Sequence, residues 1–137
     1  MIDCLFCKIV TNEIPSSRVY EDDAIVAFLD IHPTQPGHVL VVPRQHSEGF
    51  HDATSETLHR LIDATQIVAK AVLLGTGAGA FNLEQNNGVV AGQVIPHLHV
   101  HIIPRFEGDG LKHWPGKSYA EGEQELMAEK IRQAITS

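Results

Sequence analysis

The chain has 137 residues and a formal net charge of −7, with 43% apolar and 20% charged residues. At this length folding removes roughly two-thirds of the unfolded surface from water, so a single domain over 1–137 needs no disulfide framework. The acidic balance argues against a nucleic-acid or anionic-membrane surface. No apolar run approaches the roughly 20 residues that span a bilayer, and no basic segment opens the chain. We therefore expect a cytoplasmic protein that binds neither nucleic acid nor membrane.

The first part of the chain has the pattern of β-strands. Predicted strands cover 19–21, 24–29 and 38–42. The turn-prone pair Asp22 and Asp23 would join the first two strands into a hairpin. The third is short, β-branched and bounded by proline and glycine, which favours a buried strand.

The middle of the chain changes to helical spacing. Apolar residues recur at intervals of three and four between Ser55 and Leu74, which predicts one amphipathic helix. Ser55 is the expected N-cap. Glycines that can terminate the helix follow at Gly75, Gly77 and Gly79.

Strands return over 80–85 and 98–104, and the glycine-bearing loop NNGVVAGQ between them predicts a second hairpin. Ser118 could cap a last helix. Its apolar face would carry Leu126, Met127, Ile131, Ala134 and Ile135. This order of strands and helices predicts an α+β fold.

Three of the nine histidines alternate with apolar residues within one predicted strand: His97, His99 and His101. A period of two puts the three imidazoles on one face, roughly 6.5 to 7 Å apart, so that one phosphate could lie along the row. Chance alternation on a solvated face is one alternative. A three-histidine metal site is another, although metal ligands must converge whereas neighbours on a strand point in parallel.

The loop before these histidines is rich in groups that can present amide donors to an anion: Asn86, Gly88, Gly92 and Gln93. Such donors would allow an acidic protein to bind an anionic substrate. A plain hairpin connection is the alternative interpretation.

The segments AFLDIHPTQPGHVLVVPRQH and GQVIPHLHVHIIPR resemble those of the histidine triad (HIT) nucleotide-binding hydrolases, most closely the small dimeric nucleoside phosphoramidases. The resemblance implies a HIT-like fold, with an antiparallel sheet of about five strands, a long central helix and a C-terminal helix. It also implies a homodimer whose sheets join.

The activity that the resemblance implies is hydrolysis of purine nucleoside 5′-phosphoramidates, or related AMP conjugates, through a nucleotidyl-histidine intermediate. Two alternatives remain open. The first is hydrolysis of dinucleoside polyphosphates, and the second is a nucleotide-binding, zinc-stabilised interaction module with vestigial catalysis.

The resemblance implies that His99 would be the nucleophile. A neutral imidazole suits that role, since it can attack phosphorus without a metal. His101 would lie near the phosphate oxygens, His38 would support the catalytic ring, and His97 would complete the triad. A buried core histidine is the alternative role for His38.

Further family positions concern the nucleotide. Asp30 would accept hydrogen bonds from the ribose hydroxyls, Asn86 would contact the ribose or phosphate region, and Gly92 and Gln93 would bind phosphate. Val94 stands where many relatives carry a hydroxyl side chain, so that donor is missing. The positions matching the base pocket, which would otherwise be ordinary core, are Phe6, Ile9, Phe28 and Ile31.

Cys4 and Cys7 form a CxxC pair, which needs two further ligands for a tetrahedral zinc site. The resemblance to zinc-binding bacterial relatives supplies His46 and His97. Such a zinc would be structural and unnecessary for the chemical step. Reduced structural cysteines without metal are the alternative.

Overall fold

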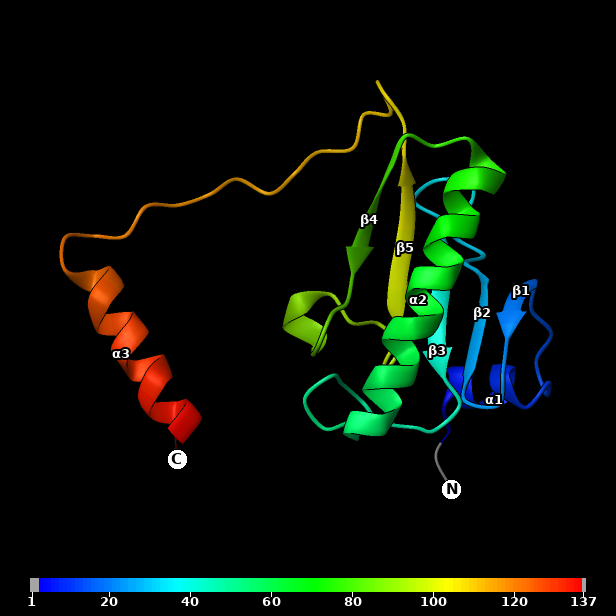
Figure 1. Ribbon diagram of the computed structural model, residues 1–137, viewed down its shortest axis with the longest axis horizontal. Helices are drawn as coiled ribbons and strands as arrows, with labels where there is room; N and C mark the ends of the chain where they lie inside the picture. The colour runs from blue at the N-terminus through cyan, green and yellow to red at the C-terminus, as the bar shows by residue number, and fades with distance from the viewer. Residues whose placement is uncertain (1–2, 137) are drawn as a thin grey trace.

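The computed structural model describes residues 3–136. Its five strands are β1 (Arg18–Glu21), β2 (Ile25–Leu29), β3 (Val39–Pro43), β4 (Ala80–Glu84) and β5 (Val100–Arg105). The helices are α1 (Leu5–Val10), α2 (Ser55–Thr76) and α3 (Glu123–Thr136), with a 3₁₀ turn η1 at Val89–Ala91. The strands form one antiparallel sheet in the order β1-β2-β3-β5-β4 (Figure 1). The predicted α+β fold is confirmed.

Both predicted hairpins are present. Between β1 and β2, the Asp22 carboxylate accepts the N–H groups of Ala24 and Ile25 at 2.8 Å each, which fixes the turn. The second hairpin pairs β4 with β5. Its second strand begins at Val100, two residues later than predicted, because the Leu98 amide donates to the Ser47 carbonyl at 2.8 Å instead of to a neighbouring strand.

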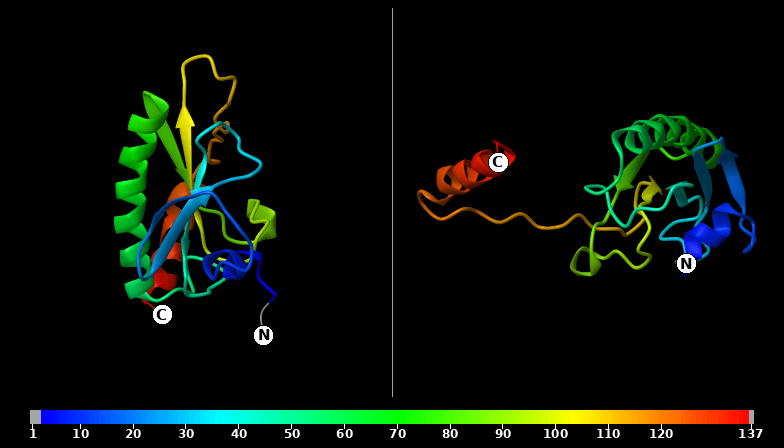
Figure 2. Two further views of the ribbon diagram at one scale, coloured as in Figure 1. Left: turned by 90° about the vertical axis from the view of Figure 1, so that its right-hand side faces the viewer. Right: turned by 90° about the horizontal axis from the view of Figure 1, so that it is seen from below.

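The long helix α2 covers one face of the sheet (Figures 1 and 2). Its side chains Leu61 and Val68 pack with Val41 and Ile102 in the larger of two cores. The predicted cap at Ser55 is wrong by one residue. Thr54 has the extended backbone that a cap requires, and its hydroxyl accepts the Thr57 N–H at 3.1 Å.

The short helix α1 was not predicted, and it covers the opposite face of the sheet (Figure 2). Phe6, Ile9 and Val10 pack with alternate residues of β2 and β3, including Val26 and Phe28, in the second core. A helix of six residues is not stable in isolation, so its packing holds it in place. The sheet is therefore enclosed by helices of very different length.

Beyond β5, residues 106–111 form a turn in which the Asp109 carboxylate accepts the N–H groups of Phe106 and Leu111. An extended arm then leads to α3, which stands away from the sheet and from α2 (Figures 1 and 2). The predicted last helix is present, but it begins at Glu123 and not near Ser118. The predicted apolar face is exposed: Leu126 is 59% and Ile131 is 56% accessible. Within residues 3–136, none of the helices combines the length and apolar character that a bilayer crossing requires.

Candidate functional site

The three histidines of the triad do lie on one side of the sheet, but they do not form one row. Leu98, Val100 and Ile102 face the core beneath α2, which leaves the alternating histidines on the α1 side. The rings of His99 and His101 are neighbours, with centroids 4.9 Å apart. His97 is fully buried, and its Nε2 faces the Pro43 carbonyl oxygen at 2.8 Å. The expected row along one phosphate is therefore a pair.

Hydrogen bonding assigns the tautomer of His99. Its Nδ1 lies 2.6 Å from the carbonyl oxygen of His97, which can only accept, so Nδ1 carries the proton and Nε2 carries the lone pair. Burial lowers the pKa of His99 from its ordinary value, against the opposing effect of that carbonyl bond. The ring of Phe6 meets it edge-on, with centroids 4.9 Å apart. His99 is thus a neutral imidazole with a free nitrogen near pH 7.

A chain of hydrogen bonds assigns the opposite tautomer to His101. The Thr34 amide donates to Nδ1 of His38 at 3.1 Å, so the proton of a neutral His38 must reside on Nε2. That nitrogen lies 2.9 Å from Nδ1 of His101, which accepts and leaves the His101 proton on Nε2. Burial lowers the pKa of both His38 and His101, which keeps them neutral near pH 7. A free nitrogen on His99 therefore neighbours an N–H donor on His101.

Asp30 follows β2 on this same side. Its Oδ2 is 3.8 Å from Nε2 of His38, while Oδ1 accepts the backbone N–H of His32 at 2.8 Å. Of the residues predicted to contact a base, Phe6, Ile9 and Phe28 are buried around α1. Ile31 is the exception, since 84% of it is exposed and the structure does not bring it into that cluster.

The hydrogen-bond donors of the loop around η1 are engaged with acceptors of the protein itself. The side chain of Gln93 accepts the Gly88 N–H at 2.7 Å and donates to the carbonyl oxygens of Glu48 and Ile95 at 2.6 and 3.0 Å. The Gly92 N–H donates to the Val89 carbonyl at 3.0 Å. Gln93 thus shapes the loop, instead of presenting a free amide to an anion as we expected.

Two further predicted positions lie close to this loop in sequence. The Asn86 amide donates to the Glu84 carboxylate at 3.1 Å, so this donor is also engaged within the chain. The Val94 side chain is exposed and offers no polar atom.

The two cysteines meet two histidines at the N-terminal end of α1. Cys4 Sγ lies 3.3 Å from Nδ1 of His97, and Cys7 Sγ lies 3.4 Å from Nδ1 of His46. The four donor atoms all lie within 4.8 Å of one another. Both thiols are free. We call Cys4, Cys7, His46 and His97 the cysteine–histidine cluster, and this cluster could hold a metal ion.

The chemistry of this donor set fits a metal. Because the Nε2 proton of His97 bonds to Pro43, Nδ1 has its lone pair directed at the sulfur atoms. Burial raises the pKa of the Cys7 thiol to about 11, so the thiolate needs a neighbouring cation. Two sulfur and two imidazole ligands match the tetrahedral preference of zinc.

A second group of possible ligands, Asp30, His38 and His101, also has its donor atoms within 4.8 Å. It does not fit a metal in this arrangement. The Thr34 amide occupies one nitrogen of His38, and the other nitrogen donates its proton to His101. This group is a hydrogen-bond network.

Sequence reasoning missed two backbone groups of the site. The Thr34 amide sets the His38 tautomer, and the Pro43 carbonyl sets that of His97. The segment PTQPG before His38 indicates a tight turn that could have drawn attention to Thr34. Nothing in the sequence marks a carbonyl of a buried strand.

The fold is that of a known class. The chain belongs to the HIT domain family, whose model matches residues 11–108. It is 42% identical over 116 residues to adenosine 5′-monophosphoramidase HNT1 of Saccharomyces cerevisiae, covering 83% of this chain and 71% of the relative.

Solved structures extend the similarity over nearly the whole chain. A crystal structure from Streptococcus mutans superposes with a TM-score of 0.93 at 38% identity, covering 98% of this chain and 87% of that one. A zinc-bound histidine triad family protein from Mycobacterium smegmatis superposes with a TM-score of 0.76 at 32% identity, covering 98% of both chains.

Proposed function

We propose that this protein hydrolyses purine nucleoside 5′-phosphoramidates, or related AMP conjugates, through a nucleotidyl intermediate on His99. The observation that carries the proposal is the pair of opposite tautomers. A lone pair on His99 Nε2 neighbours an N–H donor on His101 Nε2, and both rings are neutral near pH 7. The relative named adenosine 5′-monophosphoramidase supports this substrate class.

The proposed reaction has two displacements at phosphorus. His99 Nε2 supplies the electron pair for a new nitrogen–phosphorus bond, while the bond to the leaving amine breaks and the amine departs with its electron pair and a proton from solvent. The modified ring is cationic, and the His97 carbonyl that accepts from Nδ1 stabilises this charge. Water then displaces His99, releasing the nucleoside monophosphate and one proton. The His101 N–H donates to a phosphate oxygen throughout.

We assign the residues that would contact the nucleoside from their positions near the histidines. Asp30 is half-buried at the end of β2 and would accept from the ribose hydroxyls, with Phe6, Ile9 and Phe28 forming an apolar wall for the base. The η1 loop, including Asn86, would border the phosphate. The exposed, non-polar Val94 favours the second candidate function, a nucleotide-binding module with little catalysis.

We propose that the metal of the cysteine–histidine cluster is zinc and that its role is structural. Two thiolates and two imidazoles fill a tetrahedral coordination sphere, which leaves no position for a reacting water. The cluster would hold α1, and with it Phe6, against the sheet. His97 would thus have two roles: its ring would bind the metal, and its carbonyl oxygen accepts from Nδ1 of His99.

Assembly and location complete the proposal. We propose one domain over 1–137 that forms a homodimer through the exposed edge strand β4, where Leu83 is exposed. The free thiols suit a reducing cytoplasmic compartment. Sedimentation velocity tests the dimer, and a monomer at all concentrations would contradict it.

The decisive experiment compares the turnover of adenosine 5′-phosphoramidate with that of diadenosine polyphosphates. AMP binding is measured separately by calorimetry. Faster cleavage of the phosphoramidate supports the proposal. Preference for the polyphosphates would indicate the alternative hydrolase, and AMP binding without turnover would indicate the interaction module. Rapid acid-free quenching followed by peptide mapping should place the covalent adduct on His99.

A further inference from the structure

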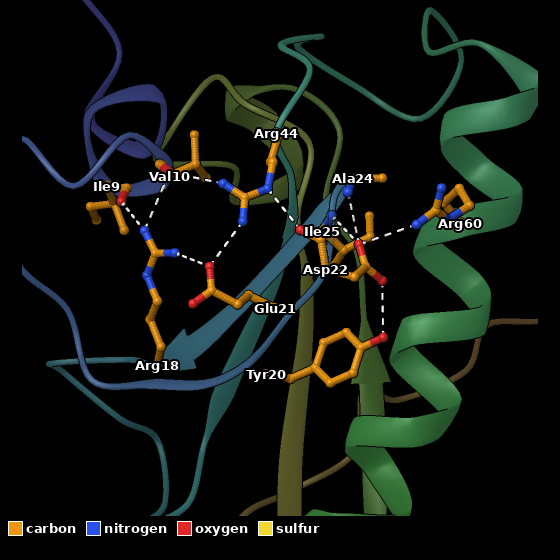
Figure 3. A network of polar contacts seen from close by, with 10 residues as sticks. All are labelled: Ile9, Val10, Arg18, Tyr20, Glu21, Asp22, Ala24, Ile25, Arg44 and Arg60. Atoms are coloured by element: carbon orange, nitrogen blue, oxygen red, sulfur yellow. Dashed lines mark hydrogen bonds and ion pairs between the residues drawn. The ribbon is translucent and has the colours of Figure 1, made fainter.

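Two arginines, one in β1 and one directly after β3, meet at the C-terminal end of α1 (Figure 3). Arg18, the first residue of β1, donates from Nη2 to the carbonyl oxygens of Ile9 and Val10 at 2.8 and 3.3 Å. Arg44, directly after β3, donates from Nη1 to the Val10 carbonyl at 3.1 Å. Both arginines therefore bind the last carbonyl groups of this helix.

A carboxylate joins the two guanidinium groups. Oε2 of Glu21 accepts from Arg18 Nη1 at 2.6 Å and from Arg44 Nη2 at 2.9 Å, which offsets the repulsion between the two cations (Figure 3). Arg44 Nε also donates to the Asp22 carbonyl at 2.9 Å. We call Arg18, Glu21 and Arg44 the arginine clamp.

The clamp supplies what a short helix lacks. The last carbonyl groups of a helix have no partner within it, and cations are favourable at that end of the helix dipole. The side chains of Arg18 and Arg44 are 16% and 33% exposed, so solvent screens them less than it screens a fully exposed ion pair. The clamp is thus a substantial anchor for six residues that could not remain helical alone.

The opposite end of α1 has the other anchor, the cysteine–histidine cluster. Between the two anchors lies Phe6, whose ring meets His99. The contacts of the clamp are with carbonyl oxygens and one carboxylate. None of these contacts involves a residue of the cluster, so loss of a metal removes none of them directly.

We infer that the arginine clamp keeps α1 docked when the cysteine–histidine cluster is without metal, so that the nucleotide site persists in the metal-free protein. Arg18 and Arg44 are positioning residues that act through α1 and Phe6. The inference rests on the proposed function only where it concerns nucleotide binding.

The experiment compares Arg18→Gln/Arg44→Gln with the native protein and with Arg60→Gln, each with zinc and after chelation. Arg60 is a matched control, because it pairs with Asp22 and Asp23 on the side of Asp22 away from α1 (Figure 3). Two quantities are measured: the rate of alkylation of Cys4 and Cys7 in metal-free protein, and the affinity for AMP.

In the metal-free double variant, we expect alkylation to be at least about tenfold faster than in native protein and AMP affinity to fall about tenfold on zinc removal. Native protein and Arg60→Gln should lose less than about threefold in AMP affinity. With zinc bound, all three should bind AMP similarly. In turnover assays, metal removal from the double variant should raise KM and leave kcat unchanged. Metal-free Arg44→Lys protein should retain part of the AMP affinity that the metal-free double variant loses.

Equal alkylation rates in native and double-variant protein would overturn the inference, as would an equal effect of Arg60→Gln. Failure of zinc-loaded native protein to bind AMP would contradict the proposed function, while the alkylation rates would still decide on the clamp. If circular dichroism shows that the double variant does not fold with zinc, the single Arg44→Gln variant provides the same comparison.

Discussion

The helices α1 and α3 differ in how they pack against the rest of the protein, and the difference does not follow their lengths. The first has six residues and the second has 14. Yet Phe6, Ile9 and Val10 of α1 are buried, whereas the apolar residues of α3 are exposed at the end of a long arm (Figure 1). Tertiary contacts hold the short helix, and local interactions hold the long one.

The local interactions of α3 are ion pairs between charged side chains of the helix itself. Arg132 pairs with Glu125 at 2.7 Å and with Glu129 at 2.9 Å, which supports the helix from within. The anchors of α1 come from β1, the residues after β3 and the triad segment. Substitutions that undock α1 should therefore affect both the fold and the nucleotide site, whereas those in α3 should affect neither within a single chain.

The largest effect expected from the α1 side is that of His99→Ala. Loss of the free nitrogen should lower kcat by at least about 10³-fold, while AMP binding persists because the apolar wall and Asp30 remain. Turnover assays and calorimetry measure the two quantities. His59→Ala is the matched control, since His59 is exposed on α2. Near-native turnover in His99→Ala would remove this residue from the nucleophile role.

Zinc removal tests the first anchor of α1. Chelation should lower the free energy of unfolding by at least about 3 kcal/mol, because the metal binds the folded cluster. Because burial raises the pKa of the Cys7 thiol to about 11, metal binding must release its proton, and zinc affinity should rise with pH. Elemental analysis and thermal melts measure these effects. A chelated protein whose melting temperature does not change when zinc is added would show that the cluster has no structural role.

One substitution made in both helices gives the most direct comparison. Ile9 is 7% exposed and Ile131 is 56% exposed, so Ile9→Ala should cost about 2 to 4 kcal/mol and Ile131→Ala less than about 0.5 kcal/mol in unfolding free energy. Urea denaturation measures both. Equal losses would break the comparison, and they would show that another chain covers α3.

Asp30→Asn should weaken AMP binding by about 1 to 3 kcal/mol, because an amide is a poorer double acceptor than a carboxylate. A 2′,3′-dideoxy analogue should bind native protein and variant alike. Calorimetry with both ligands gives the answer. Equal losses for the two ligands would mean that Asp30 does not recognise the ribose.

The smallest expected effect is a shift in pH dependence. Burial holds the pKa of His99 below its ordinary value, so kcat/KM should be level near pH 7 and should fall at lower pH as His99 becomes protonated. Phe6→Ala admits water to the ring, so the pKa should rise and the acid limb should move to higher pH. A pH profile of native protein and variant measures the shift. An unchanged limb would show that Phe6 does not shield His99.

The sheet and α2 could be predicted because their signals lie within short stretches of the sequence. Polar and apolar residues alternate around β5, β3 is a short β-branched run bounded by proline and glycine, and the three-and-four spacing of α2 provides its apolar stripe. The same alternation correctly placed the histidines of the triad on one side. The ligand set of the cluster came from resemblance to relatives, and the structure brings those four residues together.

What escaped prediction depends on contacts between distant segments. Six residues are too few for a helical period, so nothing local indicated α1. His97 leaves the row because Pro43 and the cysteines, far away in sequence, engage both of its nitrogens. Gln93 could not be assigned to the inside of its loop without knowing that the Glu48 carbonyl lies nearby.

The hydrogen bonds from Thr34 through His38 to His101 have a direction. They begin at a backbone amide, whose proton does not dissociate near neutral pH, so no proton can be passed along from that end. His38 cannot exchange tautomers without leaving that amide unsatisfied. This series of hydrogen bonds therefore does not conduct protons. Every proton that a reaction consumes or releases must cross the solvent-facing side of the site.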